Sequence, residues 1–427
     1  MLCVTAATVN DSAGIYGVKA AEVQEVNTES TESSFEYEEL ANGGLKLTKY
    51  KGSGTKAVIP SAINGKTVAV IGNEAFSGCT GLESITIPES VTNIGEGTED
   101  TGHRYTEYDV FDECRGLKEI IVEEGNAWYS SQDGVLYNKE KTQLILCPAK
   151  KEGIVAIAEG VTEIKYDFYT EGLVSAFSDC SITSISISAS LVSLRIDLFN
   201  RCSCLEEIIV DNDNEAYSSQ EGMLYNKNGD RLLLCPAGKK GSITIPEDVT
   251  AIADYNMFGY CNNLTEINVD TNNLYYSSLD GILYNKEKTE LIRCMAGKAG
   301  RILIPNGVTA INRYAFSGCA DLTEITIPEG VVSLPEGAFK DCSSLTEITI
   351  PEGVERIGNY VFQGCSSLPG ITIPKTVRKI GESMYDEDCP ALVFDDCSSM
   401  EEIIVDGNNQ VYSSQAGILY GGSAGRS

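Results

Sequence analysis

Residues 316–380 read FSGCADLTEITIPEGVVSLPEGA, then FKDCSSLTEITIPEGVERIGNYV, then FQGCSSLPGITIPKTVRKI, and this stretch decides the fold. The phrase Phe-x-x-Cys-x-x-Leu-x-x-Ile-x-Ile-Pro-x-x-Val-x-x-Ile, with Leu as its last residue in the first copy, returns here every 23 residues. A fixed period of about 20 to 30 residues with apolar positions in register predicts stacked coils. One coil cannot bury its apolar side alone, so its neighbours must complete the core. We therefore predict a single solenoid.

The same elements recur along most of the chain. Phe-x-x-Cys occurs nine times, beginning at Phe76, Phe111, Phe177, Phe199, Phe258, Phe316, Phe339, Phe362 and Phe394. The alternating Ile-x-Ile element recurs thirteen times between Ala57 and Val405, and such alternation of β-branched residues is typical of a short, half-buried strand. Side by side, these strands predict one parallel sheet in a right-handed solenoid, with irregular structure or short helical turns opposite.

A second motif interrupts the first. It reads NAWYSSQDGVLYNK at residues 126–139 and ends in an apolar stretch at Cys147. The alternating Gly-x-Leu-Tyr arm, the polar Asn-Lys tip and the apolar return arm predict a β-hairpin that projects from the solenoid or extends its sheet locally. Copies lie near 123–150, 211–238 and 270–297, and an incomplete copy starts at residue 406.

The ends of the chain differ from the repeats. Within residues 1–21, Leu2 to Val9 is small and apolar, and Val18-Lys19-Ala20 resembles the pattern before a signal-peptidase cut. This predicts a signal-peptide remnant, although a disordered terminus is the alternative. Residues 22–36 are polar and predict a disordered linker. The solenoid is expected over 37–420, with an N-terminal cap that lacks Phe-x-x-Cys, and a flexible tail over 421–427.

The charge balance excludes two classes of partner. The chain holds 62 acidic against 32 basic residues, for a net charge of -30. Such a surface repels phosphate backbones and anionic lipid, so nucleic-acid binding is not expected. No run approaches the roughly 18 apolar residues that a membrane span needs, so membrane insertion is not expected either. A basic protein, or one met through polar and aromatic contacts, fits this surface better.

The consensus resembles the BspA-type class of bacterial leucine-rich repeats, through Leu-x-x-Ile-x-Ile-Pro-x-x-Val-x-x-Ile-Gly-x-x-Ala-Phe-x-x-Cys. Gly72, Ala75, Phe76 and Cys79 carry the end of this pattern, and the Tyr-Ser-Ser-x-x-Gly-x-Leu-Tyr insertion is similar to a hairpin common in the class. The resemblance covers residues 37 to 420 and implies an α/β leucine-rich-repeat solenoid, rich in β structure. It also implies an exported protein, secreted or at the cell surface, that adheres to host or microbial proteins.

Neither cysteine nor histidine suggests a reaction or a cofactor. Nine of the 15 cysteines belong to Phe-x-x-Cys and three close the hairpins, so we predict a buried ladder of free thiols. A bridge stays open for Cys202 with Cys204 and for Cys389 with Cys397. The one histidine, His103, lies in a polar insertion, and no Cys-x-x-Cys occurs, so neither zinc nor a catalytic base is expected. The acidic runs at 211–215, 270–273 and 406–409 are interpreted as turns rather than calcium loops.

Candidate ligand-binding residues lie where side chains point outward. Glutamates that precede the Ile-x-Ile strands predict an acidic ladder at Glu119, Glu207, Glu266, Glu324, Glu347 and Glu402. Threonines in the middle of the strands form a stripe beside it, at Thr326, Thr349 and Thr372. Hairpin aromatics are a second set, at Trp128, Tyr129, Tyr217 and Tyr276. The alternatives are that threonine serves strand propensity, that glutamate serves solubility, and that the aromatics hold the hairpins to the coils.

Two functions compete at this stage. The favoured hypothesis is a non-catalytic, exported adhesion module that binds a protein ligand, such as a host extracellular-matrix or microbial surface protein, through one face of the solenoid. The alternative is a targeting or spacer segment of a larger surface enzyme whose catalytic domain lies outside this chain.

Overall fold

The computed structural model describes residues 31–95, 110–169, 172–177, 179–199, 202–382 and 393–421. The predicted signal remnant at 1–21, most of the predicted linker, and residues 422–427 of the predicted tail lie outside these ranges. So do Cys3, His103 and Cys389.

All of the predicted Ile-x-Ile segments are strands, and all pair in parallel. They fall into five separate sheets: β3 (Lys56–Val58), β6 (Ser84–Ile87) and β8 (Glu119–Val122); β12 (Gly153–Ala156), β16 (Ile182–Ile187) and β17 (Glu207–Val210); β21 (Gly241–Ile245) and β23 (Leu264–Val269); β27 (Gly300–Leu303), β29 (Leu322–Thr326) and β31 (Glu347–Thr349); β33 (Gly370–Ile373) and β35 (Glu402–Val405). The prediction of one continuous sheet is therefore wrong. We call the solvent-facing side of these strands the main face.

A second set of short strands runs along the solenoid. It comprises β7 (Asn93–Ile94), β13 (Glu163–Ile164), β22 (Ala251–Ile252), β28 (Ala310–Ile311), β30 (Ser333–Leu334), β32 (Arg356–Gly358) and β34 (Lys379–Glu382). These strands come from the end of the Val-x-x-Ile element, and β30, β32 and β34 form a parallel sheet of their own. The side that was predicted to be irregular therefore carries a second parallel ladder.

Each insertion forms a three-stranded meander. The three complete copies are β9 (Tyr129–Gln132), β10 (Val135–Asn138) and β11 (Gln143–Leu146); β18 (Tyr217–Gln220), β19 (Met223–Asn226) and β20 (Arg231–Leu234); β24 (Tyr276–Leu279), β25 (Ile282–Asn285) and β26 (Glu290–Arg293). In the fourth copy β36 (Tyr412–Gln415) pairs with β37 (Ile418–Gly421). The predicted hairpin of β10 and β11 is confirmed, and β11 extends the second ladder by pairing in parallel with β13.

The solenoid begins earlier than predicted. Residues 32–36, assigned to the disordered linker, form η1 (Glu32–Ser34) and the start of β1 (Phe35–Glu39), which pairs with β2 (Leu45–Tyr50). Phe35 is 4% exposed because its ring lies 5.2 Å from that of Tyr50, which in turn stacks at 5.3 Å on Phe76. These two rings close the phenylalanine column of the repeats. The cap sheet is completed by β5 (Lys66–Ile71) and β4 (Ala62–Ile63).

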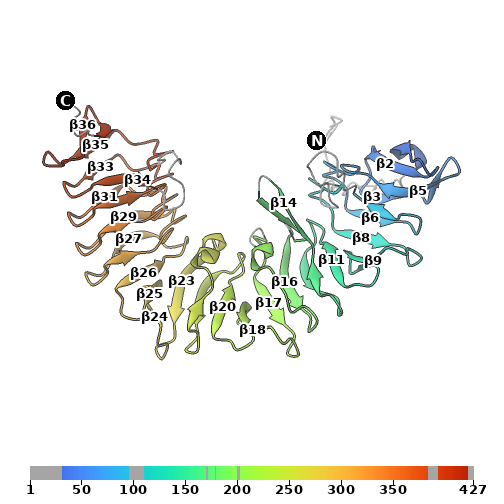
Figure 1. The fold of residues 1–427 in the computed structure, drawn as a ribbon, viewed down its shortest axis with the longest axis horizontal. Coiled ribbons are helices and arrows are strands. Elements are labelled where there is room, and N and C mark those ends of the chain that lie inside the picture. Colours follow the sequence, from blue (N-terminus) through green and yellow to red (C-terminus); the bar gives the residue numbers. More distant parts are fainter. Residues whose placement is uncertain are drawn as a thin grey trace, which may run out of the picture.

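The remaining elements are few and short. They are the hairpin of β14 (Tyr166–Tyr169) and β15 (Gly172–Ser175) and the 3-10 helices η2 (Ile196–Phe199) and η3 (Tyr255–Tyr260). The stacked coils bend into an open U, with the strands of the N-terminal cap at one tip and β35 and β36 at the other (Figure 1). No helix in the described ranges is long and apolar enough to cross a membrane.

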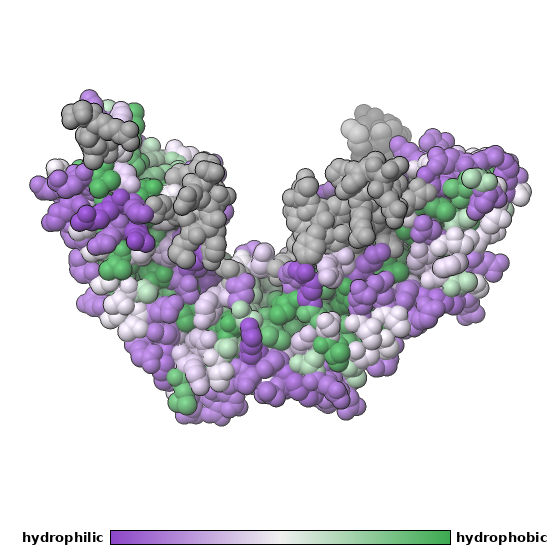
Figure 2. Space-filling model, viewed as in Figure 1, coloured by the Kyte–Doolittle hydropathy of each residue, from purple (hydrophilic) through white to green (hydrophobic). Residues whose placement is uncertain are grey.

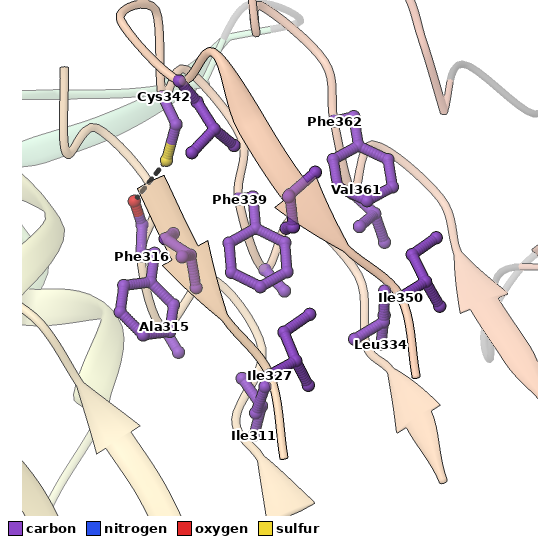
Figure 3. Packing of buried hydrophobic residues seen from close by; sticks show 14 of the residues in the cluster. Ile311, Ala315, Phe316, Ile327, Leu334, Phe339, Cys342, Ile350, Val361 and Phe362 are labelled. Atoms are coloured by element: carbon purple, nitrogen blue, oxygen red, sulfur yellow. Dashed lines mark hydrogen bonds between the residues drawn. The ribbon is translucent and has the colours of Figure 1, made fainter. Parts of the chain in front are cut away.

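The core holds a column of stacked phenylalanines, and the thiol of Cys342 lies beside this column (Figure 3). The ring centroids of Phe316 and Phe339 are 5.3 Å apart, and those of Phe339 and Phe362 are 5.8 Å apart. The thiol of Cys342 donates a hydrogen bond to the Phe316 carbonyl of the preceding coil, over 3.2 Å. Cys365 repeats this contact with Phe339. The cysteine therefore satisfies a backbone carbonyl as well as filling space.

Every cysteine in the described ranges is a free thiol, which confirms the predicted thiol ladder. Most are buried, but Cys79 and Cys397 are partly exposed. Cys202 and Cys204, one of the two places left open for a bridge, are unbridged: Cys202 is buried and Cys204 exposed.

Candidate interaction surface

The hairpins end four of the five parallel sheets of the main face by covering the last strand. The backbone N–H of Ile120 in β8 donates to the Gly134 carbonyl over 2.9 Å, and that of Val122 donates to the Ser131 hydroxyl over 2.9 Å. The same two bonds recur in the other three copies, from Ile208 and Val210, Ile267 and Val269, and Ile403 and Val405. An unpaired strand edge invites association with another chain, and the hairpin removes that edge.

A tight turn brings the hairpin close to the strand. Asp133 and Gly134 both have positive φ, of 51° and 78°, as a two-residue hairpin turn requires. A Cβ on Gly134 would lie 2.8 Å from the Cβ of Glu119, so only glycine fits. The Asp-Gly pair at 133–134 is a sequence signal for this turn, and by overlooking it our prediction missed the first hairpin, that of β9 and β10.

A buried asparagine fastens each hairpin to the coil before it. The Asn126 side chain is fully buried and makes four hydrogen bonds. Its amide donates to the carbonyls of Pro88 and Val91, both over 2.9 Å, and its oxygen accepts from the backbone N–H groups of Trp128 and Tyr129, both over 2.8 Å. Asn214, Asn273 and Asn409 make equivalent bonds.

The acidic runs beside these asparagines close turns, as predicted. The side-chain oxygens of Asp211, Asp270 and Asp406 each accept a hydrogen bond from the backbone N–H two residues on, over 2.8 Å. No group of three or more metal-ligating side chains occurs in the part of the chain that the structure describes.

Three of the four candidate aromatics hold the hairpins in place. Tyr129 and Tyr276 are only 8% and 7% exposed, and Tyr217 is half-buried. The Tyr129 hydroxyl accepts a hydrogen bond from the Ile94 N–H, and that of Tyr217 accepts one from Leu194. These three tyrosines are structural, and we remove them from the candidate contact surface. Trp128 is 58% exposed and stays in it.

The glutamates do not form a continuous ladder. On most of the paired strands, other residues fill the position that the glutamates occupy. The residues in register within each sheet are Lys56, Ser84 and Glu119; Ile154, Ser184 and Glu207; Ser242 and Glu266; Arg301, Glu324 and Glu347; and Gly370 and Glu402. Only Glu324 and Glu347 are neighbours on paired strands, and Glu324 forms an ion pair with Arg301 over 3.1 Å. Residues that share a place in the repeat are separated in space wherever a hairpin intervenes, so the predicted acidic ladder is wrong as a continuous feature.

The threonine stripe exists in one part of the main face. Thr326 and Thr349 are neighbours on β29 and β31, and Leu303, 68% exposed, precedes them on β27. Isoleucine takes the outward position on three of the four strands that precede a hairpin, where Ile121, Ile209 and Ile404 are 42%, 41% and 45% exposed, and Asn268 takes it on β23. The surface in Figure 2 is accordingly mostly hydrophilic, with scattered apolar patches.

Three of the candidate residues meet at a groove of about 430 Å³ across β31, β33 and β35. Thr349 and Thr372 line it, together with Ile404 and the acidic side chains Glu352, Glu401, Glu402 and Asp406. Gly370 contributes no side chain beside Glu402, which keeps the groove open. Lys375 lies 3.8 Å from Glu352 at one end. The groove is therefore strongly acidic, with a hydroxyl-bearing and partly apolar lining.

This groove lies at a boundary between sheets that no hairpin covers. β31 ends one sheet and β33 begins the next, and no ladder joins these two fully described strands. A strand edge that no ladder covers can pair with an extended segment of another chain. Sequence reasoning identified Thr349, Thr372 and Glu402 but could not find the groove, because the motif continues across it without interruption.

The repeat pattern matches a known family model over most of the chain. The family model described as the BspA type leucine rich repeat region matches in six copies, over residues 53–98, 159–229, 238–289 and 295–416. The chain is similar to a leucine rich cell surface protein from Faecalibacterium prausnitzii, with 21% identity over 88% of this chain and 94% of that chain and a TM-score of 0.40. No curated protein matches the chain.

Two further solved structures are similar at the same level. The pneumococcal vaccine antigen PcpA has 19% identity over 90% of this chain and 83% of that chain, with a TM-score of 0.43. A leucine-rich repeat protein from Eubacterium ventriosum has 19% identity over 84% of this chain and 95% of that chain, with a TM-score of 0.41.

Proposed function

Because the chain belongs to the BspA-type leucine-rich repeat family, we propose that it is a non-catalytic adhesion module that binds a protein ligand through its main face. Proteins of this family are typically exported and surface-associated, which supports a location outside the cell or on its surface. The proposed ligand is a basic segment of a host extracellular-matrix or microbial surface protein.

The acidic groove across β31, β33 and β35 carries this proposal. It offers four carboxylates to lysine or arginine side chains, two threonine hydroxyls to backbone groups, and Ile404 to an apolar side chain. Carboxylates at a rim steer a basic partner toward the surface and raise the association rate more than they slow dissociation. The net charge of -30 extends this attraction beyond the groove.

The buried positions support a role in binding rather than catalysis. The inward side chains of each coil are committed to packing, and the repeat leaves only outward positions free to vary. Two exposed groups add to the contact surface, Leu303 on β27 and Trp128 at the start of the first hairpin. Exposed tryptophan is enriched where proteins recognise one another.

Surface plasmon resonance against a panel of extracellular-matrix and bacterial surface proteins tests the proposal. We expect at least one basic protein to bind, with an association rate that falls as salt rises, because exposed charges are screened within about 8 Å at physiological ionic strength. Replacing Glu352, Glu401 and Glu402 with glutamine should slow association.

The matched control replaces Glu159, Glu247 and Glu287, which are exposed in turns away from the groove, and removes the same net charge. Equal association rates for the two triple variants would contradict binding at the groove. Failure of every panel member to bind would contradict the adhesion function itself.

A further inference from the structure

One coil at the groove differs from its neighbours at two adjacent residues. The consensus Leu-x-x-Ile is the same in three successive coils, but the two residues inside it change. They are Thr323-Glu324 and Thr346-Glu347 in the first two coils and Pro369-Gly370 in the third, the coil of β33. The proline removes a backbone donor that the neighbouring coils have, and the glycine removes a side chain.

The proline interrupts the hydrogen bonds between coils. The Thr346 N–H donates to the Thr323 carbonyl over 3.0 Å, and the Glu401 N–H donates to the Pro369 carbonyl over 2.8 Å. Pro369 has the same place in the repeat as these two donors but carries no N–H. In the part of the chain that the structure describes, no group donates to the Thr346 carbonyl. The boundary between β31 and β33 therefore has a cause in the sequence, and it leaves a backbone acceptor free.

The glycine leaves room for the groove on the outward side. A Cβ on Gly370 would lie 3.0 Å from the carbonyl oxygen of Glu402 and 3.2 Å from its Cγ. The Glu402 side chain therefore leans over the glycine, and a larger residue at position 370 would displace it. The volume of about 430 Å³ across the three strands depends on this missing side chain.

The groove offers several acceptors and a single cation. Its carboxylates are those of Glu352, Glu401, Glu402 and Asp406. Among the described residues only Glu352 has an ion-pair partner, Lys375 at 3.8 Å. Such a groove fits a side chain that combines a positive charge with several N–H donors. Ile404 lies in the same groove and can pack against the aliphatic stem of that side chain.

We propose that the groove binds an arginine side chain of an extended protein segment, an inference that names the partner of the proposed adhesion function and rests on it. A guanidinium carries five N–H donors in a rigid plane, so it bonds one carboxylate through two of them and has others left for a second carboxylate or a backbone carbonyl. A lysine ammonium is a compact point charge that cannot form the same bidentate pair. Pro369 and Gly370 determine this specificity, because together they create the free acceptor and the opening.

The test compares three peptides on the full chain. They are acetyl-Gly-Ser-Arg-Ser-Gly-amide and its counterparts with lysine or with citrulline, which has the shape of arginine without its charge. Binding is followed through the methyl resonances of isotopically labelled isoleucine, since Ile371 and Ile404 line the groove. We expect the arginine peptide to shift the Ile404 resonance. The lysine peptide should bind about tenfold more weakly, because it forms at least one charged hydrogen bond fewer, and the citrulline peptide should cause no shift.

A double substitution tests the two residues that distinguish this coil. Pro369→Thr with Gly370→Glu reproduces the Thr-Glu pair of the two preceding coils, so the variant should fold and β33 should join β31 in one ladder. It should weaken binding of the arginine peptide by about tenfold or more. Gly81→Glu is the control, because it adds the same charge at a site where a new Cβ meets nothing within 4 Å. It should leave binding unchanged.

Equal affinities for the arginine and lysine peptides would overturn the inference, and so would arginine binding that shifts other isoleucines but not Ile404. The peptide comparison needs only the unaltered protein, so it decides the question whether or not the double variant folds. Retention of full arginine affinity by a folded double variant would also overturn it. The adhesion function is judged separately, since a panel protein that binds the groove through lysine would uphold that function while the arginine inference fails.

Discussion

Replacing Asn126 with alanine should be among the most destabilising single changes outside the phenylalanine column. The side chain is fully buried and its amide makes four hydrogen bonds of 2.8–2.9 Å, two with the preceding coil and two with the hairpin. Alanine removes the Asn126 side chain from two carbonyls and two backbone N–H groups at once, although the Pro88 carbonyl keeps a second donor, the Val91 N–H, at 3.3 Å. The hairpin and the coil beneath it lose the same link.

The magnitude follows from these four groups. Leaving one buried polar group unsatisfied costs about 1–3 kcal/mol. Water entering the vacated volume recovers part of the loss for some of them, so we expect the free energy of unfolding of this region to fall by about 4 kcal/mol. Asn409→Ala is the control, because Asn409 makes the same four bonds but is only half-buried. Its loss should cost about 1–2 kcal/mol, since solvent can replace the missing partners.

Urea unfolding followed by tryptophan fluorescence measures the effect, because the chain has one tryptophan and it lies two residues from Asn126. Native-state hydrogen exchange at the amides of β9 and β10 reports local opening of the hairpin separately from global unfolding. A variant within about 0.5 kcal/mol of the unaltered protein, the range of ordinary surface substitutions, would refute the reasoning. A cost at Asn409 equal to that at Asn126 would also refute it, since burial would then not set the magnitude.

Two further changes test the turn and the thiols. Gly134→Ala should destabilise the protein by about 2 kcal/mol more than Gly229→Ala in urea unfolding. Both glycines have positive φ, but only a Cβ on Gly134 would meet a neighbour, the Cβ of Glu119 at 2.8 Å. Equal effects of the two substitutions would show that this close approach relaxes without cost. Burial raises the pKa of Cys114 to about 12, so the unfolded chain releases this proton at lower pH than the folded one. The free energy of unfolding under reducing conditions should therefore fall as pH rises from about 9 toward 12. It should fall less in Cys114→Ala. An identical pH dependence in that variant would contradict this reasoning.

The core of the fold was predictable because its determinants repeat. Ile325 and Ile348 are 23 residues apart and face inward on neighbouring strands. Phe316 and Phe339 have the same spacing, and their rings stack on each other in the core. An apolar residue that returns at a fixed spacing must be buried by its own copies in a stack. The strands, the phenylalanine column and the thiol ladder therefore follow from the sequence with little further information.

The candidate surface was less predictable because its positions do not share a local cause. Glu119 and Glu324 have the same place in the repeat, but a hairpin glycine lies against the first and an ion pair with Arg301 engages the second. The groove depends on Gly370 and on a sheet boundary that no motif marks. Arg293 occupies a position that leucine fills in the two equivalent coils, at Leu146 and Leu234, and only the stacking of coils brings its guanidinium to the carbonyls of Tyr314 and Ser317.

The insertions divide the core and the main face of the solenoid at the same places. Ile120 and Val155 are 35 residues apart, so a hairpin-bearing coil is 12 residues longer than the regular one. The extra residues end the parallel sheet on the main face, while β11 continues the second ladder and Cys147 keeps the place of a phenylalanine. Each complete hairpin lies between two buried clusters and gives side chains to both, and the main face is divided at the same places into short sheets with their own composition. Because neighbouring sheets are not joined by a ladder, a change of side chains on one need not disturb the next. A ligand should accordingly be recognised by one or two sheets, and the groove at β31, β33 and β35, the boundary that no hairpin covers, is where two of them can act together.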